Sequence, residues 1–247
     1  MQSIRYIGLW VGILLIVCGQ NTYAEQWQQI PGSAKQVAAG SDGTVWTLGT
    51  TKVGNGYAIF RWIGGYWHRM PGEAVKLGVG SSEHVWAIDG KGKIYRWNGN
   101  DWQNIEGTAR DIDVGADGSV WVADADGMRN SASIYKWDGA TWSKQPGAGV
   151  RMGIGSDQHV WMLDSKHNIF HWTGEKWQKM PGSAEKISVG ADGSAWMIKP
   201  KTSKNSNIYK WTRWGWEEQS SQAKTIAVGN AASVWITDQK NRIWRYK

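Results

Sequence analysis

Hydrophobic and polar positions alternate in short runs along most of this 247-residue chain, and no segment carries a sustained helical stripe. Runs such as "SVWVA" at 119–123 and "IYKW" at 134–137 are rich in β-branched and aromatic residues and are bounded by Gly, Asn and Asp. Such runs are typical of short strands separated by tight turns. The pattern therefore predicts an all-β protein.

One pattern of predicted strands is repeated six times along the sequence. A tryptophan in a "VW"-like phrase anchors each copy, with spacings of 40, 35, 40, 35 and 39 residues. An "IYKW"-like run follows each anchor, and in five copies a third Trp comes five residues after that run's own Trp, often leading into Pro-Gly. The six anchors are Trp46, Trp86, Trp121, Trp161, Trp196 and Trp235. Repeats of this length indicate a fold made of stacked, equivalent units.

Turn residues fix how the strands of one unit are joined. Gly64, Gly99, Gly139 and Gly174 each fall first in a two-residue connection, which predicts a type II′ hairpin. This hairpin places Trp62 opposite Trp67, and the corresponding tryptophans opposite each other in the other copies. Asp-Gly pairs at 42–43, 117–118 and 192–193 mark a second hairpin, ahead of the "VW" strand.

Four short antiparallel strands repeated about every 37 residues describe a β-propeller blade. The sixth unit ends at Lys247 without its fourth strand, while "EQWQQIPG" at 25–32 is a fourth strand without a unit. We therefore expect a six-bladed β-propeller of four-stranded antiparallel blades, in which the N-terminal strand completes the last blade. Such closure removes exposed sheet edges.

The first 24 residues differ from the repeats. A short start with Arg5, an apolar run from about Ile7 to Cys18 and a small-residue end at Ala24 are typical of a secretory signal peptide. The run is too short to span a bilayer. We predict cleavage after Ala24, a secreted or periplasmic location and a single domain over 25–247. Lipoprotein processing at Cys18, the only cysteine, stays an alternative.

The repeated pattern "VGSDGTVW…IYRW…W-x-x-[IM]-P-G" resembles tectonin repeats. These repeats occur in tachylectin-1-like and fish egg lectins and in tectonins of slime moulds and fungi, and the resemblance covers the chain from residue 25 onward. It implies a six-bladed propeller that recognises surface glycans, including bacterial lipopolysaccharide. It implies no particular sugar.

A cation precedes each anchor by ten or eleven residues. Because the first strand of a blade lines the propeller channel, six cations at its start would focus a positive potential on one opening and attract phosphate or carboxylate groups. The alternative is that their stems pack on neighbours and their charges are merely solvated. The six are Lys35, Lys76, Arg110, Arg151, Lys186 and Lys224.

Two further sets are candidate ligand-binding residues. Longer polar segments follow "VW" in alternate units, at 47–58, 122–133 and 197–207, and contain Asn55, Asn130 and Asn205, whose amides suit sugar hydroxyls. Tyr66 and Trp214 break the repeat pattern beside the third tryptophans and are candidates for stacking on sugar rings. Each set also has an ordinary interpretation, as tolerated insertions or surface aromatics.

No catalytic, metal-ligating or cofactor-binding constellation is recognisable, and we expect neither an enzyme nor a metalloprotein. With a net charge of +7 and no dense basic run, nucleic acid is not an expected partner. The sequence thus predicts a monomeric, exported carbohydrate-binding protein, without a transmembrane segment after cleavage, that engages glycans or lipopolysaccharide through repeated weak sites. The alternative is a propeller scaffold that binds a protein at the loop-rich channel face.

Overall fold

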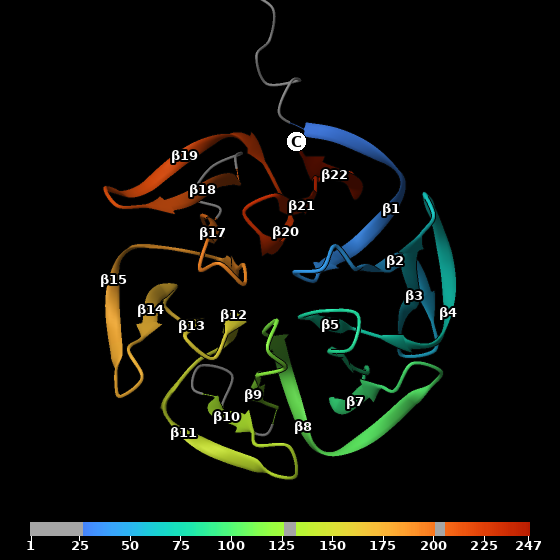
Figure 1. The fold of residues 1–247 in the computed structure, drawn as a ribbon, viewed down its shortest axis with the longest axis horizontal. Coiled ribbons are helices and arrows are strands. Elements are labelled where there is room, and N and C mark those ends of the chain that lie inside the picture. Colours follow the sequence, from blue (N-terminus) through green and yellow to red (C-terminus); the bar gives the residue numbers. More distant parts are fainter. Residues whose placement is uncertain (1–26, 126–131, 201–205) are drawn as a thin grey trace, which may run out of the picture.

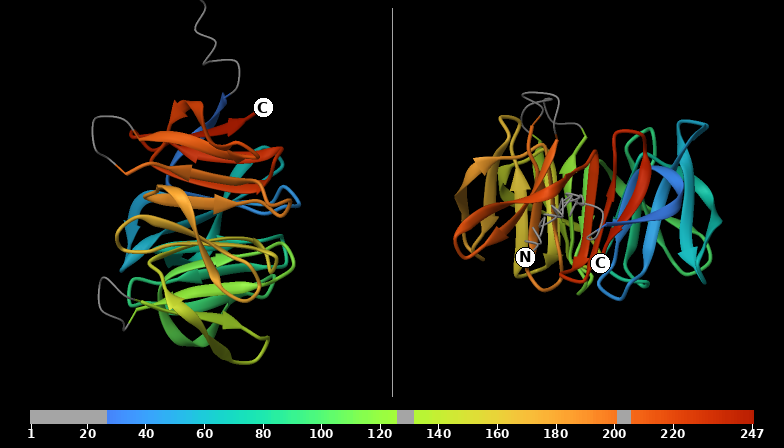
Figure 2. Two further views of the ribbon diagram at one scale, coloured as in Figure 1. Left: turned by 90° about the vertical axis from the view of Figure 1, so that its left-hand side faces the viewer. Right: turned by 90° about the horizontal axis from the view of Figure 1, so that it is seen from above.

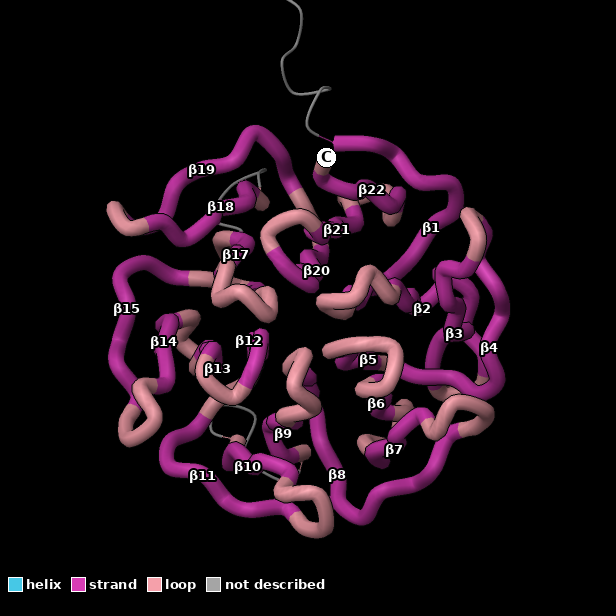
Figure 3. Tube along the Cα trace, in the orientation of Figure 1, coloured by secondary structure: helices cyan, strands magenta, loops and turns pink. Residues whose placement is uncertain are grey.

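A computed structural model describes residues 27–125, 132–200 and 206–247 of the chain. These residues form strands arranged around a central axis, and no helix occurs among them (Figures 1 and 3). Seen edge-on, the molecule is a disc whose strands run between its two faces (Figure 2). The predicted signal peptide lies outside the described residues. No helix in the described parts of the chain is long and apolar enough to cross a membrane.

The strands follow one another as the repeats predict. Their bounds are β1 Trp27–Ala39, β2 Val45–Val53, β3 Gly56–Ile63, β4 Tyr66–Ala74, β5 Lys76–Val79, β6 Val85–Ile88, β7 Lys93–Trp97, β8 Trp102–Val114, β9 Val120–Asp124, β10 Ser133–Trp137, β11 Trp142–Ala148, β12 Arg151–Ser156, β13 His159–Leu163, β14 Asn168–Trp172, β15 Trp177–Ser183, β16 Lys186–Val189, β17 Ala195–Ile198, β18 Asn207–Thr212, β19 Gly215–Gln222, β20 Thr225–Asn230, β21 Ser233–Thr237 and β22 Arg242–Tyr246.

Hydrogen-bonded strands are antiparallel neighbours, and the pairing groups them as β1–β4, β5–β8, β8–β11, β12–β15, β16–β19 and β20–β22 with β1. Two long strands serve two groups each. The first half of β8 pairs with β7 and its second half with β9. The arrangement is that of a β-propeller.

The two ends of the described chain lie side by side in one sheet. Residues 27–33 of β1 pair with β22, with Trp27 opposite Tyr246 and Ile30 opposite Ile243. The second half of β1 then pairs with β2. The segment that the sequence analysis left without a unit thus lies against the last strand of the chain.

Tryptophans fill the seams between successive groups. Trp46 is fully buried and packs edge-on against Trp97 and Trp102 of the next group. The same triad recurs at Trp86 and at Trp121, where the contact with Trp172 is tilted and that with Trp177 is edge-on. Because each indole removes a large apolar area from water and prefers edge-to-face partners, the anchors act as seam-filling core residues.

The third tryptophans form a second contact across the seams. Each donates its indole N–H to a backbone carbonyl of the preceding group: Trp67 to Pro31 at 2.7 Å, Trp102 to Pro71 at 2.9 Å, Trp142 to Glu106 at 2.8 Å, Trp177 to Pro146 at 2.7 Å and Trp216 to Pro181 at 2.9 Å. These bonds explain why Trp and Pro-Gly recur together, and they give this set a structural role.

The hairpins agree with the sequence in register and differ in one turn. Trp62 lies opposite Trp67, and Trp97 opposite Trp102, as predicted. In the first repeat, however, Gly64 and Gly65 both have positive φ, of 60° and 89°. Positive φ at both central residues belongs to a type I′ turn. The prediction of type II′ is therefore wrong for that repeat, because two successive glycines remove the steric bar to I′.

Candidate functional site

The innermost strands surround a narrow axial channel. Six register-equivalent residues, each opposite an anchor tryptophan, form what we call the inner layer: Ala38, Gly78, Asp113, Gly153, Ser188 and Ala227. Two residues earlier on the same strands lies a second set, the mouth layer: Gln36, Lys76, Asp111, Arg151, Lys186 and Thr225. The two sets share a strand face because side chains alternate with a period of two.

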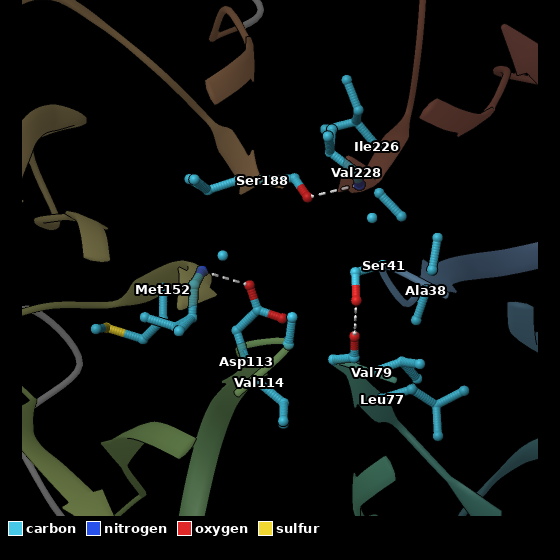
Figure 4. A pocket seen from close by; sticks show the side chains of 18 of the residues that line it. Ala38, Ser41, Leu77, Val79, Asp113, Val114, Met152, Ser188, Ile226 and Val228 are labelled. Atoms are coloured by element: carbon cyan, nitrogen blue, oxygen red, sulfur yellow. Dashed lines mark hydrogen bonds between the residues drawn. The ribbon is translucent and has the colours of Figure 1, made fainter. Parts of the chain in front are cut away.

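Side chains of these layers bond across to the next innermost strand. Gln36 exchanges two hydrogen bonds with the backbone of Leu77, at 2.8 and 3.0 Å. Asp113 accepts from Ile154 N at 2.9 Å, and Ser188 Oγ accepts from Val228 N at 3.0 Å. Figure 4 shows Asp113 and Ser188 pointing into the channel. The channel holds about 50 Å³ of open space, room for only a few water molecules. A larger ligand can therefore be recognised at its mouth but cannot pass through.

Three of the six predicted cations belong to the mouth layer. Lys76, Arg151 and Lys186 lie opposite Ile88, Leu163 and Ile198, at the end of the channel from which the innermost strands start. The segments that follow the "VW" strands leave from the same face. The structure thus brings together three of the six predicted cations.

The other three cations lie one residue outside the layer. Lys35 and Arg110 sit at register shifts of β1 and β8, and Lys224 precedes β20. Lys35 Nζ lies 5.8 Å from the ring centroid of Tyr57, and Lys224 Nζ donates to Asn241 Oδ1 at 2.7 Å. Arg110 donates to the carbonyls of Asp124 and Ala125. The expected ring of six cations is therefore a group of three, because register shifts displace Lys35 and Arg110 and because Lys224 lies before the start of β20.

The mouth layer carries both signs of charge. Lys76 Nζ forms a 2.7 Å ion pair with Asp111 Oδ1, whose side chain is 2% exposed and whose other oxygen accepts from Met152 N at 2.8 Å. Burial, followed by the nearby charges of Arg151 and Lys76, lowers the pKa of Lys186 to about 8, and Asp111 and Glu185 oppose the shift. Positive charge is thus crowded at Arg151 and Lys186.

The pKa of Asp113, in the inner layer, is shifted upward. Burial raises its pKa to about 7, and the neighbouring Asp111 adds to the rise, while Lys76 and the N–H groups of Ile154 and Val114 oppose it. The carboxyl group therefore titrates near neutral pH. Sequence reasoning missed both aspartates because no other repeat has an acidic residue there: the position of Asp113 is otherwise Gly, Ala or Ser, and that of Asp111 is otherwise Gln, Thr or a cation.

The predicted amide ligands are only partly described. Asn55 is exposed in the turn between β2 and β3, where its N–H donates to Glu73 Oε1 at 2.8 Å. Segment 47–58 is a hairpin, since β2 and β3 extend almost to that turn, and the expected long loop is absent there. Asn130 and Asn205 lie outside the described residues.

The predicted aromatic ligands, Tyr66 and Trp214, are the most exposed large hydrophobic residues among those described, at 73% and 84%. Both belong to turns between a third and a fourth strand, on the face opposite the mouth layer. Tyr66 lies in the β1–β4 group and Trp214 in the β16–β19 group, which are not adjacent (Figure 1). The structure does not bring them together with the cations or with each other.

A cleft on that opposite face was not predicted. It has a volume of about 410 Å³ and lies between the β5–β8 and β8–β11 groups, and we call it the β7–β10 cleft. Trp86 and Trp137 form part of its wall, with Arg96 beside them. Lys136 crosses one end in a 2.5 Å ion pair with Asp157. The cleft joins residues that are distant in sequence, from His84 to Asp157, so only the folded structure reveals it.

His84 and His159 contact serine side chains close to them in sequence. His84 Nδ1 and His159 Nδ1 lie 3.1 Å from Ser81 Oγ and Ser156 Oγ, within their own hairpins. Within the described ranges, no three His, Cys, Asp or Glu side chains gather as metal ligands would.

The fold and its channel define the class of protein, a β-propeller with a polar axial channel. A family model, the tectonin domain, matches residues 50–126, 73–161 and 148–247. The chain belongs to the tectonin family, as the repeat pattern indicated. No curated protein matches the sequence at a significant level.

Solved propellers share the fold at low identity. A gluconolactonase of Xanthomonas campestris is 13% identical, with a TM-score of 0.63, covering 89% of this chain and 88% of the other. Regucalcin, a calcium-binding protein of Agrobacterium tumefaciens, is 11% identical, with a TM-score of 0.60 and coverages of 89% and 90%. The WD40 β-propeller domain of Doa1 is 10% identical, with a TM-score of 0.57 and coverages of 90% and 97%. At these identities the likeness concerns the fold alone.

Proposed function

We propose that the protein is an exported, lectin-like carbohydrate-binding protein that recognises surface glycans. Its scaffold would be a ring of six blades closed by β1, supported by the pairing of Trp27 with Tyr246. Export rests on the leader-like residues 1–24. Weak sites around a rigid ring would gain avidity on a dense glycan surface.

The observation that carries the proposal is the β7–β10 cleft. The half-buried indole of Trp137, against which the buried Trp86 packs edge-on, would offer an apolar surface to a sugar face. Ionic groups at the rim can bond to hydroxyls. Arg96 is exposed, with its guanidinium 6.0 Å from the ring centroid of Trp86. A volume of about 410 Å³ is within the usual range for small-ligand sites.

A glycan array on residues 25–247, followed by calorimetry on the best ligand, tests the proposal. We expect Arg96→Ala to weaken binding about tenfold, the size of one charge-assisted hydrogen bond. Lys144→Ala, an exposed cation on β11 outside the cleft, is the matched control and should change affinity less than twofold. An array without ligands refutes the lectin function, while equal effects of both variants refute the cleft as the site.

On the face opposite the β7–β10 cleft, the cations of the mouth layer would favour anionic glycans such as lipopolysaccharide, as a second place of contact. Their binding should weaken as salt rises, because ions screen exposed charges beyond about 8 Å at physiological ionic strength. Binding that is insensitive to salt would contradict this preference.

A protein-binding scaffold is the alternative. The hairpin of β2 and β3 projects on the mouth face and exposes Val53 to 40%, a contact point that suits a protein more than a sugar. We propose a binding function in preference to an enzymatic one. Turnover of a sugar lactone by the purified protein would overturn that preference.

A further inference from the structure

The mouth layer has an excess of positive charge at one place. Lys76 is paired with Asp111, and Gln36 is bonded to the next strand. Arg151 and Lys186, which follow one another around the axis on the adjacent strands β12 and β16, have no carboxylate partner within the described residues. Nη1 of Arg151 donates to the carbonyl of Val150 at 3.0 Å.

Such a pair is costly without a counter-charge. Both side chains are half-buried, and two like charges that share a low-dielectric site repel each other more strongly than in bulk water. The pKa of Lys186 is lowered first by burial and second by the charge of Arg151. A bound anion would supply the missing charge to both groups.

The chemistry of the two cations selects the anion. A guanidinium offers a fork of donors that matches two oxygens of one anion, and an ammonium adds a mobile point charge. A phosphate group carries about −1.5 to −2 at neutral pH and so matches two unpaired cations, whereas one carboxylate matches only one. The channel below is too narrow for a larger body, so the rest of any ligand would remain outside.

We propose that Arg151 and Lys186 bind a single phosphate group at the mouth of the channel. Thr225 follows Lys186 in the mouth layer, and its hydroxyl is the third group of this site. That hydroxyl lies 2.7 Å from Thr237 Oγ1. The site is independent of the β7–β10 cleft, so the absence of glycan binding would leave it standing.

Calorimetry with inorganic phosphate on residues 25–247 tests the proposal. We expect Arg151→Gln and Lys186→Gln each to weaken binding tenfold or more, as for the loss of a hydrogen bond between charged groups. Lys35→Gln removes the same charge from a predicted cation that lies outside the layer, and should change affinity less than twofold. Thermal unfolding without ligand checks that each variant folds. No binding to the parent protein, or equal losses in all three variants, overturns the proposal.

A second measurement uses sulfate, whose charge does not change between pH 6 and 9. The groups that face the Lys186 ammonium are Arg151, Lys76, Asp111 and its neighbour Glu185. Because an anion binds the protonated amine, affinity should fall as pH rises through about 8. The fall should be smaller in Lys186→Gln, where only the deprotonation of Asp113 near pH 7 remains. The same slope in both proteins contradicts the assignment of Lys186.

Glucose 6-phosphate and glucose distinguish the source of the group. Binding of glucose 6-phosphate but not glucose would identify a phosphate borne on a sugar. Binding of inorganic phosphate alone would identify the free ion. Binding of glucose as tightly as glucose 6-phosphate would overturn recognition through phosphate.

Discussion

At the scale of the residue, the repeated aspartates of the Asp-Gly turns and the unrepeated Asp113 have pKa values shifted in opposite directions. Asp42, Asp117 and Asp192 each accept a 2.8 Å bond from an N–H of the next repeat. Burial opposes their ionisation, yet these and the local hydrogen bonds outweigh it and lower the pKa of each carboxyl. At Asp113, by contrast, burial outweighs the hydrogen bonds and raises the pKa of the carboxyl.

The raised pKa of Asp113 predicts a loss of stability as pH rises. The folded protein holds this proton up to about pH 7, whereas the unfolded chain releases it near pH 4, so the contribution falls with increasing pH between these values. We expect the urea midpoint of the parent protein to fall from pH 5 to pH 8 more than that of Asp113→Asn. Parallel pH profiles of the two proteins would contradict this account.

At the scale of the element, each fourth strand is both a sheet edge and a support for the next repeat. The glycine after proline has positive φ, and its face lies against the following tryptophan. A Cβ added at Gly147, where φ is 92°, would lie 2.9 Å from the Trp177 ring. Close approach of the indole and an unusual backbone conformation therefore both require glycine there.

Alanine substitutions at Gly147 and Gly139 separate the effect of the close indole from that of the backbone conformation. Gly139 has a φ of 105° but no atom within 4 Å of an added Cβ. We expect Gly139→Ala to cost about 1 kcal/mol from backbone strain, and Gly147→Ala to cost at least about 1 kcal/mol more, through the displaced tryptophan. Chemical denaturation measures both variants. Equal costs would mean that the seam tolerates the extra atom.

At the scale of the whole molecule, the seams join all the groups into one cooperative body. Buried residues from neighbouring groups form a hydrophobic cluster at each seam, and the cluster with Ile30, Val37 and Trp235 includes both parts of β1. The seam between β19 and β22 is different. Ser220 and Ser221 stand where every other repeat has a Gly after Pro or Glu, and the buried Nε1 of Trp27 has no hydrogen-bond partner among the described residues.

Ring closure can be tested by moving the chain ends. Because Trp27 lies opposite Tyr246, a short turn can join residue 247 to residue 27, with new ends opened in the exposed turn at Glu175. We expect this permutant to fold cooperatively with nearly the parent stability. A chain that starts at Ala34 should lose several kcal/mol, since it exposes the partners of Trp27 and Ile30. A truncated chain as stable as the parent would argue against closure.

The sequence by itself determined the repeat, the strand order and the turn positions, because these depend on local spacing and on residues such as Gly and Asp. It also identified the tryptophan pairs, since cross-strand partners follow from turn length. Only the tertiary structure decided which of the six cations share a layer. A one-residue bulge at Lys35 and Arg110 turns the neighbouring Gln36 and Asp111 into the layer instead, and such a shift depends on how strands from distant repeats pack. The β7–β10 cleft was hidden for the same reason, because its walls meet only across a folded seam.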